Sequence, residues 1–320
     1  AREAISLAAP GKIDPRLVDI LTEESLPRFQ DLCDLGIRFQ RNGDGALSLH
    51  PGCFSPDHRR AVVFTNLAQA FERFHNRLQG KVRFLPGWHT RQLLTVQETT
   101  PRACGALLAN PADPGANMAV RSKATVMALG GPAPLYPWHQ AGPGNPGYSP
   151  ALLHRAGVHL VNLGFLQMMW AAVEDQGFWS FSRFQPGLLL RTVHGRVIAP
   201  EEHLFEHRRK RTTHCPAAYG LADSALDQFL LHHLDDSGCV EIFEPVHGWR
   251  KIAPMAHAGN GGAWINEQSQ TNLRSLYACG ECAAGMHGAN RIGGAMITAT
   301  QVFGRRAGLY AAREARGSGL

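Results

Sequence analysis

The chain has 320 residues, of which 44% are hydrophobic and 18% are charged. This composition is ordinary for a globular protein, and the length allows two domains with separate cores. The formal net charge of +6 suits an anionic partner, but basic residues cluster only at 207–211 (HRRKR). A run this short is usually a solvated loop, so we expect an acidic small molecule and no nucleic acid. No apolar run approaches the roughly 18 residues needed for a transmembrane segment.

The first half predicts two helices and then strands. Asp14-Pro15 is a helix start, and apolar residues at helical spacing continue to Gly36. A second helix follows Phe64-Thr65 and ends before Gly80. Four short extended runs separated by turn residues then predict a β-meander, at 82–84, 93–96, 106–108 and 119–120. Residues 124–129 (ATVMAL) are continuous and apolar, which is typical of a buried parallel strand, and Gly130-Gly131-Pro132 ends it.

The second half predicts an insertion. A helix at 151–157 and a strand at 159–163 precede an irregular segment that runs to about residue 254. This segment contains a hairpin turn at His194-Gly195 and a helix at 223–234. We therefore expect residues 1–163 and 256–320 to form one discontinuous domain with a partly parallel sheet, and 164–255 to form a cap.

The most specific stretch is 276–308, LYACGECAAGMHGANRIGGAMITATQVFGRRAG. A short apolar strand is followed at once by Gly280-Glu281, then by a glycine-rich loop with Asn290 and Arg291, and then by a helix. A carboxylate at the end of a strand can accept hydrogen bonds from the hydroxyls of a ribose. A glycine loop before a helix lets backbone N–H groups approach an electron-rich ligand. The pattern indicates a nucleotide or flavin site.

The seven cysteines are dispersed, which favours a reducing, cytoplasmic setting over a disulfide framework. Cys279 and Cys282 have the spacing of a redox or zinc motif, but the two residues between them already serve the nucleotide interpretation. We expect packed, reduced thiols without metal, with a dithiol centre or zinc site as the alternative. No Cys/His quartet with zinc-finger spacing occurs among the 16 histidines.

The string from Gly280 to Gly308 resembles the C-terminal FAD segment of the fumarate reductase, succinate dehydrogenase and L-aspartate oxidase flavoprotein family. Weaker similarities extend over most of the chain, at ALGG (128–131), RAG (155–157) and HAGNGG (257–262). The resemblance implies an α/β fold: a Rossmann-like, three-layer FAD-binding domain with a β-meander insertion, and an inserted α+β capping domain. FAD is the implied cofactor.

The same resemblance implies roles for individual residues. Arg291 would clamp a substrate carboxylate and His257 would add a hydrogen bond to it. The family's RGEG segment, which holds a catalytic arginine, has no clear counterpart, so Arg191 is a candidate, with Arg196 beside it. The residues implied to bind FAD are Gly130, Gly131, Gly280, Glu281, Asn290, Ala295 and Ile297.

The departures from the family pattern also matter. Nothing in residues 1–35 resembles its GxGxxG pyrophosphate loop, and the chain lacks an initial Met. We therefore expect an internal fragment or one piece of a split protein that holds FAD weakly alone, although a complete chain that lost the motif is the alternative. Met169 stands where the family has a substrate-binding histidine, Pro146-Gly147-Tyr148-Ser149 replaces TGDG, and Ala295-Met296-Ile297 replaces N-(S/A)-L.

Two functional hypotheses follow from the resemblance. The first is an FAD-dependent oxidoreductase that transfers hydride between flavin N5 and a small dicarboxylate or amino-dicarboxylate. L-aspartate oxidase is the preferred type, followed by fumarate reductase or succinate dehydrogenase, with an acceptor protein or oxygen as electron partner. The alternative is a catalytically degenerate module or subunit of the same family, or one with a different substrate.

Overall fold

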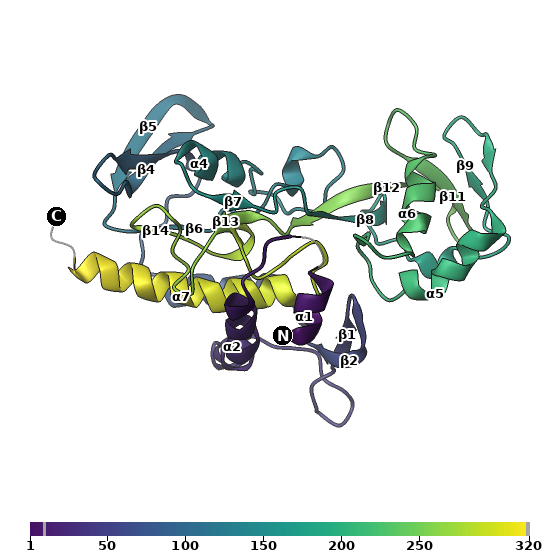
Figure 1. Cartoon of the computed structure of the whole chain (residues 1–320), viewed down its shortest axis with the longest axis horizontal. Coiled ribbons are helices and arrows are strands. Elements are labelled where there is room, and N and C mark those ends of the chain that lie inside the picture. The colour runs from purple at the N-terminus through teal and green to yellow at the C-terminus, as the bar shows by residue number, and fades with distance from the viewer. Residues whose placement is uncertain (9–10, 318–320) are drawn as a thin grey trace.

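A long C-terminal helix organises one half of the molecule. The computed structural model describes residues 1–8 and 11–317, and in it α7 (Ala295–Gly317) runs along one side of this half (Figure 1). Helix α7 packs against α2 (Pro15–Asp34), against β6 (Thr125–Met127) and against β14 (Leu276–Ala278). The shared core contains the buried side chains of Leu17, Leu276, Val302 and Phe303.

Strands β6 and β14 lie side by side and run parallel, with Leu276 opposite Thr125 and Ala278 opposite Met127. The prediction that these two apolar runs share one sheet is confirmed. Strand β6 is shorter than the expected 124–129, and Val126 is 38% exposed. Since α7 covers the pair and Met127 is buried in the core, the alternate side chain of Val126 points to the uncovered face.

The β-meander has three strands. They are β3 (His89–Val96), β4 (Arg102–Asn110) and β5 (Asp113–Arg121), joined in antiparallel order. The expected strand at 82–84 is wrong. The backbone amides of Lys81 and Val82 donate to the carbonyl of Leu78, so this segment closes the preceding helix instead of extending.

The N-terminal region has its own small core of Leu32, Ile37, Phe39 and Ala70. Asp14 caps α2 by accepting from the amide of Arg16, as its sequence predicts. The second predicted helix is α3 (Leu67–Leu78), which Asn66 caps by accepting from Gln69. The other elements of this region are α1 (Arg2–Leu7), β1 (His50–Gly52) and β2 (Ser55–Ala61), and the two strands form an antiparallel hairpin.

The inserted region contains a five-stranded antiparallel sheet in the order β10-β9-β11-β12-β8. The strands are β8 (Leu166–Ala172), β9 (Leu190–Arg191), β10 (Val197–Ile198), β11 (Val240–Glu244) and β12 (Gly248–Gly259). The predicted turn at 194–195 joins β9 and β10, and the predicted helix is α6 (Ser224–Leu231). A separate core of buried aromatic and aliphatic side chains fills this region, which we call the cap.

Strand β12 continues through the expected boundary at 255/256 and crosses from the cap into the centre of the molecule (Figure 1). The division into 1–163 with 256–320 and 164–255 therefore stays a prediction, and residues 9–10 and 318–320 lie outside the described part. The remaining elements are α4 (Ser149–Arg155), α5 (Arg208–Arg211), β7 (Leu160–Val161), β13 (Gly262–Trp264) and β15 (Ala283–Ala284), with 3-10 turns at 133–135, 181–183, 202–207 and 280–282. Among the described helices, none is long and apolar enough to cross a membrane.

Candidate active site

The carboxyl ends of β6 and β14 meet at one edge of their sheet because the two strands are parallel. Gly130 (φ +77°) and Gly280 (φ +61°) follow these strands in the left-handed backbone region that favours glycine. The Cys282 thiol connects the two ends, since Sγ accepts from the amide of Leu129 at 3.0 Å and donates to the carbonyl of Gly130 at 3.3 Å. The four predicted residues Gly130, Gly131, Gly280 and Glu281 therefore come together.

Glu281 lies over this edge in a mostly buried position. Its Oε1 accepts from the amide of Gly259 at 2.6 Å. A Cβ at Gly131 would come within 2.0 Å of the same oxygen, so a larger residue there would displace the Glu281 carboxylate. Burial raises the pKa of Glu281, while the Gly259 hydrogen bond and the charge of Arg291 oppose that rise. The carboxylate is an acceptor held in a low-dielectric environment.

Arg291 is buried in the glycine-rich loop, and neutral groups hold its guanidinium. Nε donates to Oδ1 of Asn260 at 3.2 Å, one Nη donates to Oε1 of Gln167, and the other donates to the carbonyl of Ile292 at 3.4 Å. Within the described residues, no carboxylate forms an ion pair with it. Burial lowers the pKa of Arg291 to about 10, and Glu281 and Cys53 oppose this change. The side chain remains a cation without a bonded anion at neutral pH.

His257 occupies an irregular position in β12. The pairing with β8 passes from Ala256 opposite Met168 to Ala258 opposite Gln167, so His257 is the extra residue of a β-bulge. Bulges re-aim side chains and are common beside active sites. Its Nδ1 is buried and has no hydrogen-bond partner within residues 1–8 and 11–317. Burial lowers the pKa of His257 to about 4, and the nearby positive charge of Arg291 adds to this effect.

A second histidine, His287, is buried just before the arginine. Among the described residues, its Nε2 also has no hydrogen-bond partner, and burial, followed by the charge of Arg291, lowers its pKa to about 3. Both histidines are therefore neutral near pH 7. The cluster around Arg291 therefore contains one cation, Arg291, and two neutral histidines, His257 and His287.

The other predicted FAD residues surround this cluster. The side-chain amide of Asn290 pairs with the backbone of Tyr219, donating to its carbonyl and accepting from its amide, both at 2.8 Å. This contact joins the loop to the cap. Ala295 and Ile297 lie in the first turn of α7, where Ile297 is 49% exposed.

Arg191 is not part of the cluster. It lies on β9 at the outer end of the cap, far from α7 and β14 in the molecule (Figure 1). Its Nε donates to Glu241 at 2.6 Å, and its guanidinium covers the ring of Trp249 at 3.9 Å. These contacts occupy the side chain, so the geometry does not support the predicted catalytic role, which stays a prediction.

Two residues that hold Arg291 were not singled out as site residues from the sequence. Gln167 lies on β8 and Asn260 follows β12, and Asn260 also donates to the carbonyl of Gly288 at 2.9 Å. The signal for them was present in the LQMM and HAGNGG segments. Met169, on the same strand as Gln167, is buried.

Similarity to known proteins identifies the family of this chain. The profile of the FAD binding domain family matches residues 2–297. The chain belongs to this FAD binding domain family. It is 29% identical to a subunit of the fumarate reductase (CoM/CoB) of Methanothermobacter marburgensis over 345 aligned positions, covering 95% of this chain and 60% of that protein. It is 27% identical to an L-aspartate oxidase of Caulobacter vibrioides, covering 96% of this chain and 63% of the relative.

The fold is also similar to that of solved flavoprotein structures. The apo Sdh1 complex of Mycobacterium smegmatis superposes with a TM-score of 0.78 at 18% identity, covering all of this chain and 58% of that one. This likeness confirms the mixed α/β class. The predicted family resemblance is confirmed, and the chain spans about 60% of the length of the curated relatives it matches.

The residues present fit part of an FAD molecule. Gly131 leaves no room for a Cβ beside the Glu281 carboxylate, and that buried carboxylate is suited to accept from a ligand hydroxyl. His257 and His287 offer buried nitrogens without partners, as a site for a polar ligand would. The four glycine and glutamate positions at the strand ends are therefore the residues that would hold FAD.

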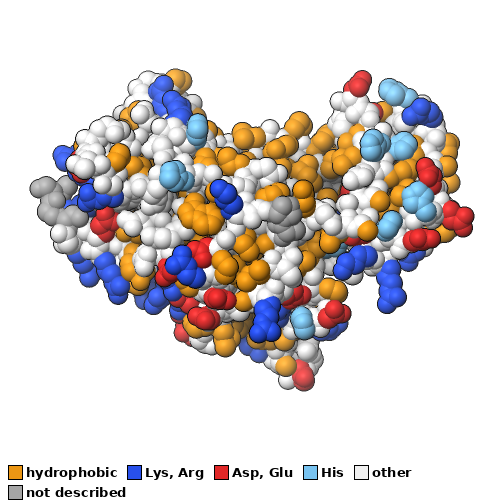
Figure 2. All heavy atoms as spheres, in the orientation of Figure 1, with side chains coloured by type: hydrophobic (Ala, Val, Ile, Leu, Met, Phe, Trp, Pro, Cys, Tyr) orange, Lys and Arg blue, Asp and Glu red, His pale blue; other side chains and the backbone are white. Residues whose placement is uncertain are grey.

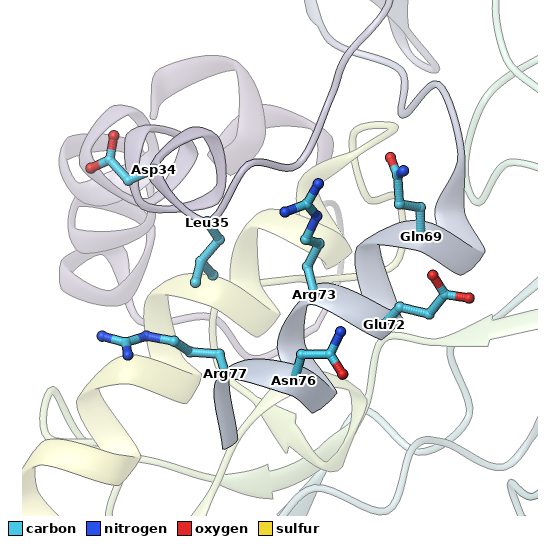
Figure 3. Close-up of a pocket in the computed structure, with 7 residues that line it drawn as sticks. All are labelled: Asp34, Leu35, Gln69, Glu72, Arg73, Asn76 and Arg77. Atoms are coloured by element: carbon cyan, nitrogen blue, oxygen red, sulfur yellow. The ribbon is translucent and has the colours of Figure 1, made fainter. Parts of the chain in front are cut away.

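A separate surface groove lies away from these residues. It is lined by α3 and the end of α2, with a volume of about 660 Å³, and Arg73 and Arg77 reach across it (Figure 3). Its position beside the small N-terminal core does not connect it to Arg291 or Glu281. The groove adds nothing to the candidate active site.

Proposed function

We propose that this protein is an FAD-dependent oxidoreductase that acts on a small dicarboxylate or amino-dicarboxylate, with L-aspartate as the preferred substrate. Family membership supports the cofactor and the class of chemistry. One observation supports the acidic substrate: Arg291 is buried, charged and held only by neutral groups.

The donors of Arg291 suit a carboxylate. A guanidinium has five N–H groups in a planar fork, and three of them donate to Asn260, Gln167 and Ile292. The remaining two can bind a carboxylate without breaking these contacts. A substrate anion would also supply the negative charge that the buried guanidinium lacks.

The surrounding residues would orient the substrate and keep water away. When bound, FAD supplies the hydride acceptor or donor. In the tautomer that carries the proton on the nitrogen facing the substrate, neutral His257 would donate one hydrogen bond to the substrate carboxylate. Met169 is buried on the adjacent strand and presents an apolar thioether, so it contributes shape and no strong hydrogen bond. Orientation against the cofactor is then the main contribution of this chain.

For the electron acceptor that reoxidises the flavin, we propose two chemical classes and do not choose between them. The similar protein from Methanothermobacter is named as a subunit, which favours an acceptor protein. The similar protein from Caulobacter is named as an L-aspartate oxidase, which favours oxygen. We propose that one of these two classes of acceptor reoxidises the flavin.

The test is anaerobic titration of the full-length, FAD-loaded protein. L-aspartate or succinate should reduce the flavin and bleach its visible absorbance, and fumarate added to the reduced protein should reoxidise the flavin and restore that absorbance. L-asparagine, which lacks the second carboxylate, is the matched ligand control and should have a much weaker effect. If none of these dicarboxylates changes the spectrum of the bound flavin, the proposed substrate class is wrong.

A second candidate is a flavoprotein module with a different substrate or no turnover. Met169 in place of a substrate-binding histidine favours it, as does the position of Arg191 outside the cluster. In that case FAD would bind and Arg291 would still attract a carboxylate. Succinate would then perturb the flavin spectrum without reducing the flavin.

A further inference from the structure

Two cysteines from distant parts of the chain meet beside the glycine-rich loop. Cys53 lies in the turn between β1 and β2, and Cys215 lies in the cap segment 212–219. The backbone amide of Cys215 donates to Sγ of Cys53 at 3.3 Å, and each of the two thiols shifts the pKa of the other. In the same contact, the amide of Phe54 donates to the carbonyl of Thr213, also at 3.3 Å.

Each cysteine is held by a firm support. The carbonyl of Cys53 accepts from the amide of Gly293 at 3.1 Å, and a Cβ at Gly293 would come within 2.6 Å of the Cys53 amide. On the cap side, buried Arg211 donates to the carbonyls of His214 and Cys215 at 2.6 and 3.2 Å. The ring of His214 stacks on Phe54 at 4.3 Å. These contacts hold the two backbone segments that carry Cys53 and Cys215 next to each other.

We propose that Cys53 and Cys215 form a reversible disulfide that fastens the cap to the β1–β2 turn, which packs against the loop carrying Arg291. Neither residue belongs to the set proposed to bind FAD or substrate. The pair also differs from Cys279 and Cys282, whose thiols are buried and contact strand ends.

The environments of the two thiols assign their roles. The hydrogen bond from Cys215 lowers the pKa of Cys53 to about 6, with further contributions from the Cys215 amide and from the charges of His214 and Arg291, against the effect of burial. Hydrogen bonding to Cys53 raises the pKa of Cys215. Cys53 is therefore the thiolate nucleophile at neutral pH, and the exposed Cys215 is the resolving thiol.

The oxidant in this proposal is a peroxide. The Cys53 thiolate attacks one oxygen of hydrogen peroxide, which breaks the O–O bond and gives a sulfenic acid and, after protonation of the leaving hydroxide, water. The sulfur of Cys215 then attacks the sulfenyl sulfur, forms the S–S bond, and releases its proton and a hydroxide that combine as a second water. The charge that raises the pKa of Cys215 disappears with the first step, so the second step becomes easier.

The disulfide would add a covalent link to an existing contact. Tyr219, four residues after Cys215, already pairs through its backbone with Asn290 in the loop. Oxidation would fix the segment 212–219 at two points, at Cys215 to the β1–β2 turn and at Tyr219 to the loop. The cap could then no longer separate from Arg291 without reduction of the bond.

The test is peptide mapping of the full-length protein after hydrogen peroxide treatment, without reductant and with free thiols alkylated. Trypsin places Cys53 in peptide 42–59 and Cys215 in peptide 212–250, which also holds Cys239. The Cys239→Ser variant is therefore the parent for mapping. The two peptides should appear linked, with the loss of two hydrogens, and dithiothreitol should separate them.

Cys53→Ser and Cys215→Ser should each abolish the linked species, and Cys33→Ser is the matched control that should leave it unchanged. Circular dichroism checks that each variant is folded. Alkylation of Cys53 by iodoacetamide in the unoxidised parent should reach half of its limiting rate near pH 6. Recovery of both peptides unlinked after peroxide, or a Cys53 link to Cys33 or Cys104 of equal yield, would overturn the proposal.

Discussion

The cap and the glycine-rich loop each bury one arginine, and their surroundings differ. Arg211 in the cap forms a bidentate ion pair with Asp227, with both N···O distances at 2.9 Å, and its guanidinium covers the ring of Phe181 at 4.1 Å. Arg291 in the loop donates only to amide and carbonyl oxygens among the described residues. We interpret Arg211 as a structural residue because Asp227 neutralises its charge. Arg291 has no such partner in the described part of the chain, so we interpret it as the arginine that is available to a ligand anion.

The space-filling view shows how the two regions are placed. The cap stands beside the larger half with a hollow between them along the upper side (Figure 2). The buried ion pair of Arg211 and Asp227 lies inside the cap. The indole of Trp170 also donates to Asp227, at 2.9 Å. The cluster around Arg291 lies where β12 enters the larger half.

Arg211→Met should have the largest effect on stability. It leaves the Asp227 carboxylate buried without its cation, and breaking a buried pair in this way costs about 3–5 kcal/mol. The free energy of unfolding, measured in urea, should fall by this amount. Arg209→Met, at an exposed neighbouring position, is the control and should change it by less than about 0.5 kcal/mol. A loss for Arg211→Met as small as that of the control would remove the distinction between the two arginines.

Arg291→Met should instead affect ligand binding most. Two charge-assisted hydrogen bonds to a carboxylate are lost, and we expect dicarboxylate affinity to fall about 100-fold, or about 2.7 kcal/mol. Stability should fall by only about 1–2 kcal/mol, because the groups left behind are the neutral amides of Gln167 and Asn260. Titration of the FAD-loaded protein measures the first quantity. Arg305→Met on the exposed face of α7 is the control, and equal affinity in both variants would exclude Arg291 from the substrate site.

Glu281→Ala tests the other half of the same site. A charged acceptor bonded to a cofactor hydroxyl contributes roughly 1.5–3 kcal/mol, so FAD affinity should fall about tenfold to 150-fold. Fluorescence titration of the full-length protein with FAD measures this change. Glu23→Ala replaces an exposed carboxylate on α2 and should leave the affinity unchanged. If the two variants bind FAD equally, Glu281 is not a ligand.

The sequence predicted the strand-end half of the site because local rules determine it. Two apolar runs followed by glycines imply parallel neighbours, and parallel strands bring their carboxyl ends to one edge. Positions 130 and 280 both have a left-handed backbone, which explains why Gly130 and Gly280 are glycines. Helix caps at Asp14 and Asn66 are local in the same way.

The contacts of the two buried arginines depend on tertiary packing and were not predictable from local pattern. Gln167 reaches Arg291 across 124 positions in sequence. The basic run at 207–211 predicted a solvated loop. That prediction is wrong for Arg211, which is 1% exposed, because Asp227 sixteen residues later neutralises it. Composition alone does not reveal such a partner.

Burial of His287 in the loop should make the free energy of unfolding depend on pH, and we expect this effect to be smaller than those above. The pKa of His287 is about 3 when folded, against an ordinary value of 6.5. The unfolded chain therefore binds more protons between these values, and the free energy of unfolding falls as the pH falls through this window. Between pH 7 and pH 5 this group accounts for about 2 kcal/mol. His287→Gln should reduce the pH dependence of unfolding by that amount, and the exposed His203→Gln should not. Parallel pH profiles for wild type and His287→Gln would contradict the burial argument.

The smallest effect is expected for Arg191, the third arginine in this comparison. Its side chain is 32% exposed, and its ion pair with Glu241 is partly open to solvent, so the pair contributes no more than about 1 kcal/mol. Arg191→Gln removes the guanidinium from Trp249 and Glu241 and should change dicarboxylate affinity and turnover by less than about twofold, since a group that touches no substrate contributes no transition-state energy. Assaying Arg191→Gln beside Arg291→Met in the same preparation provides the contrast. A large loss of turnover with unchanged stability in Arg191→Gln would mean that the cap moves this arginine to the substrate, and it would restore the catalytic role that the family resemblance implies.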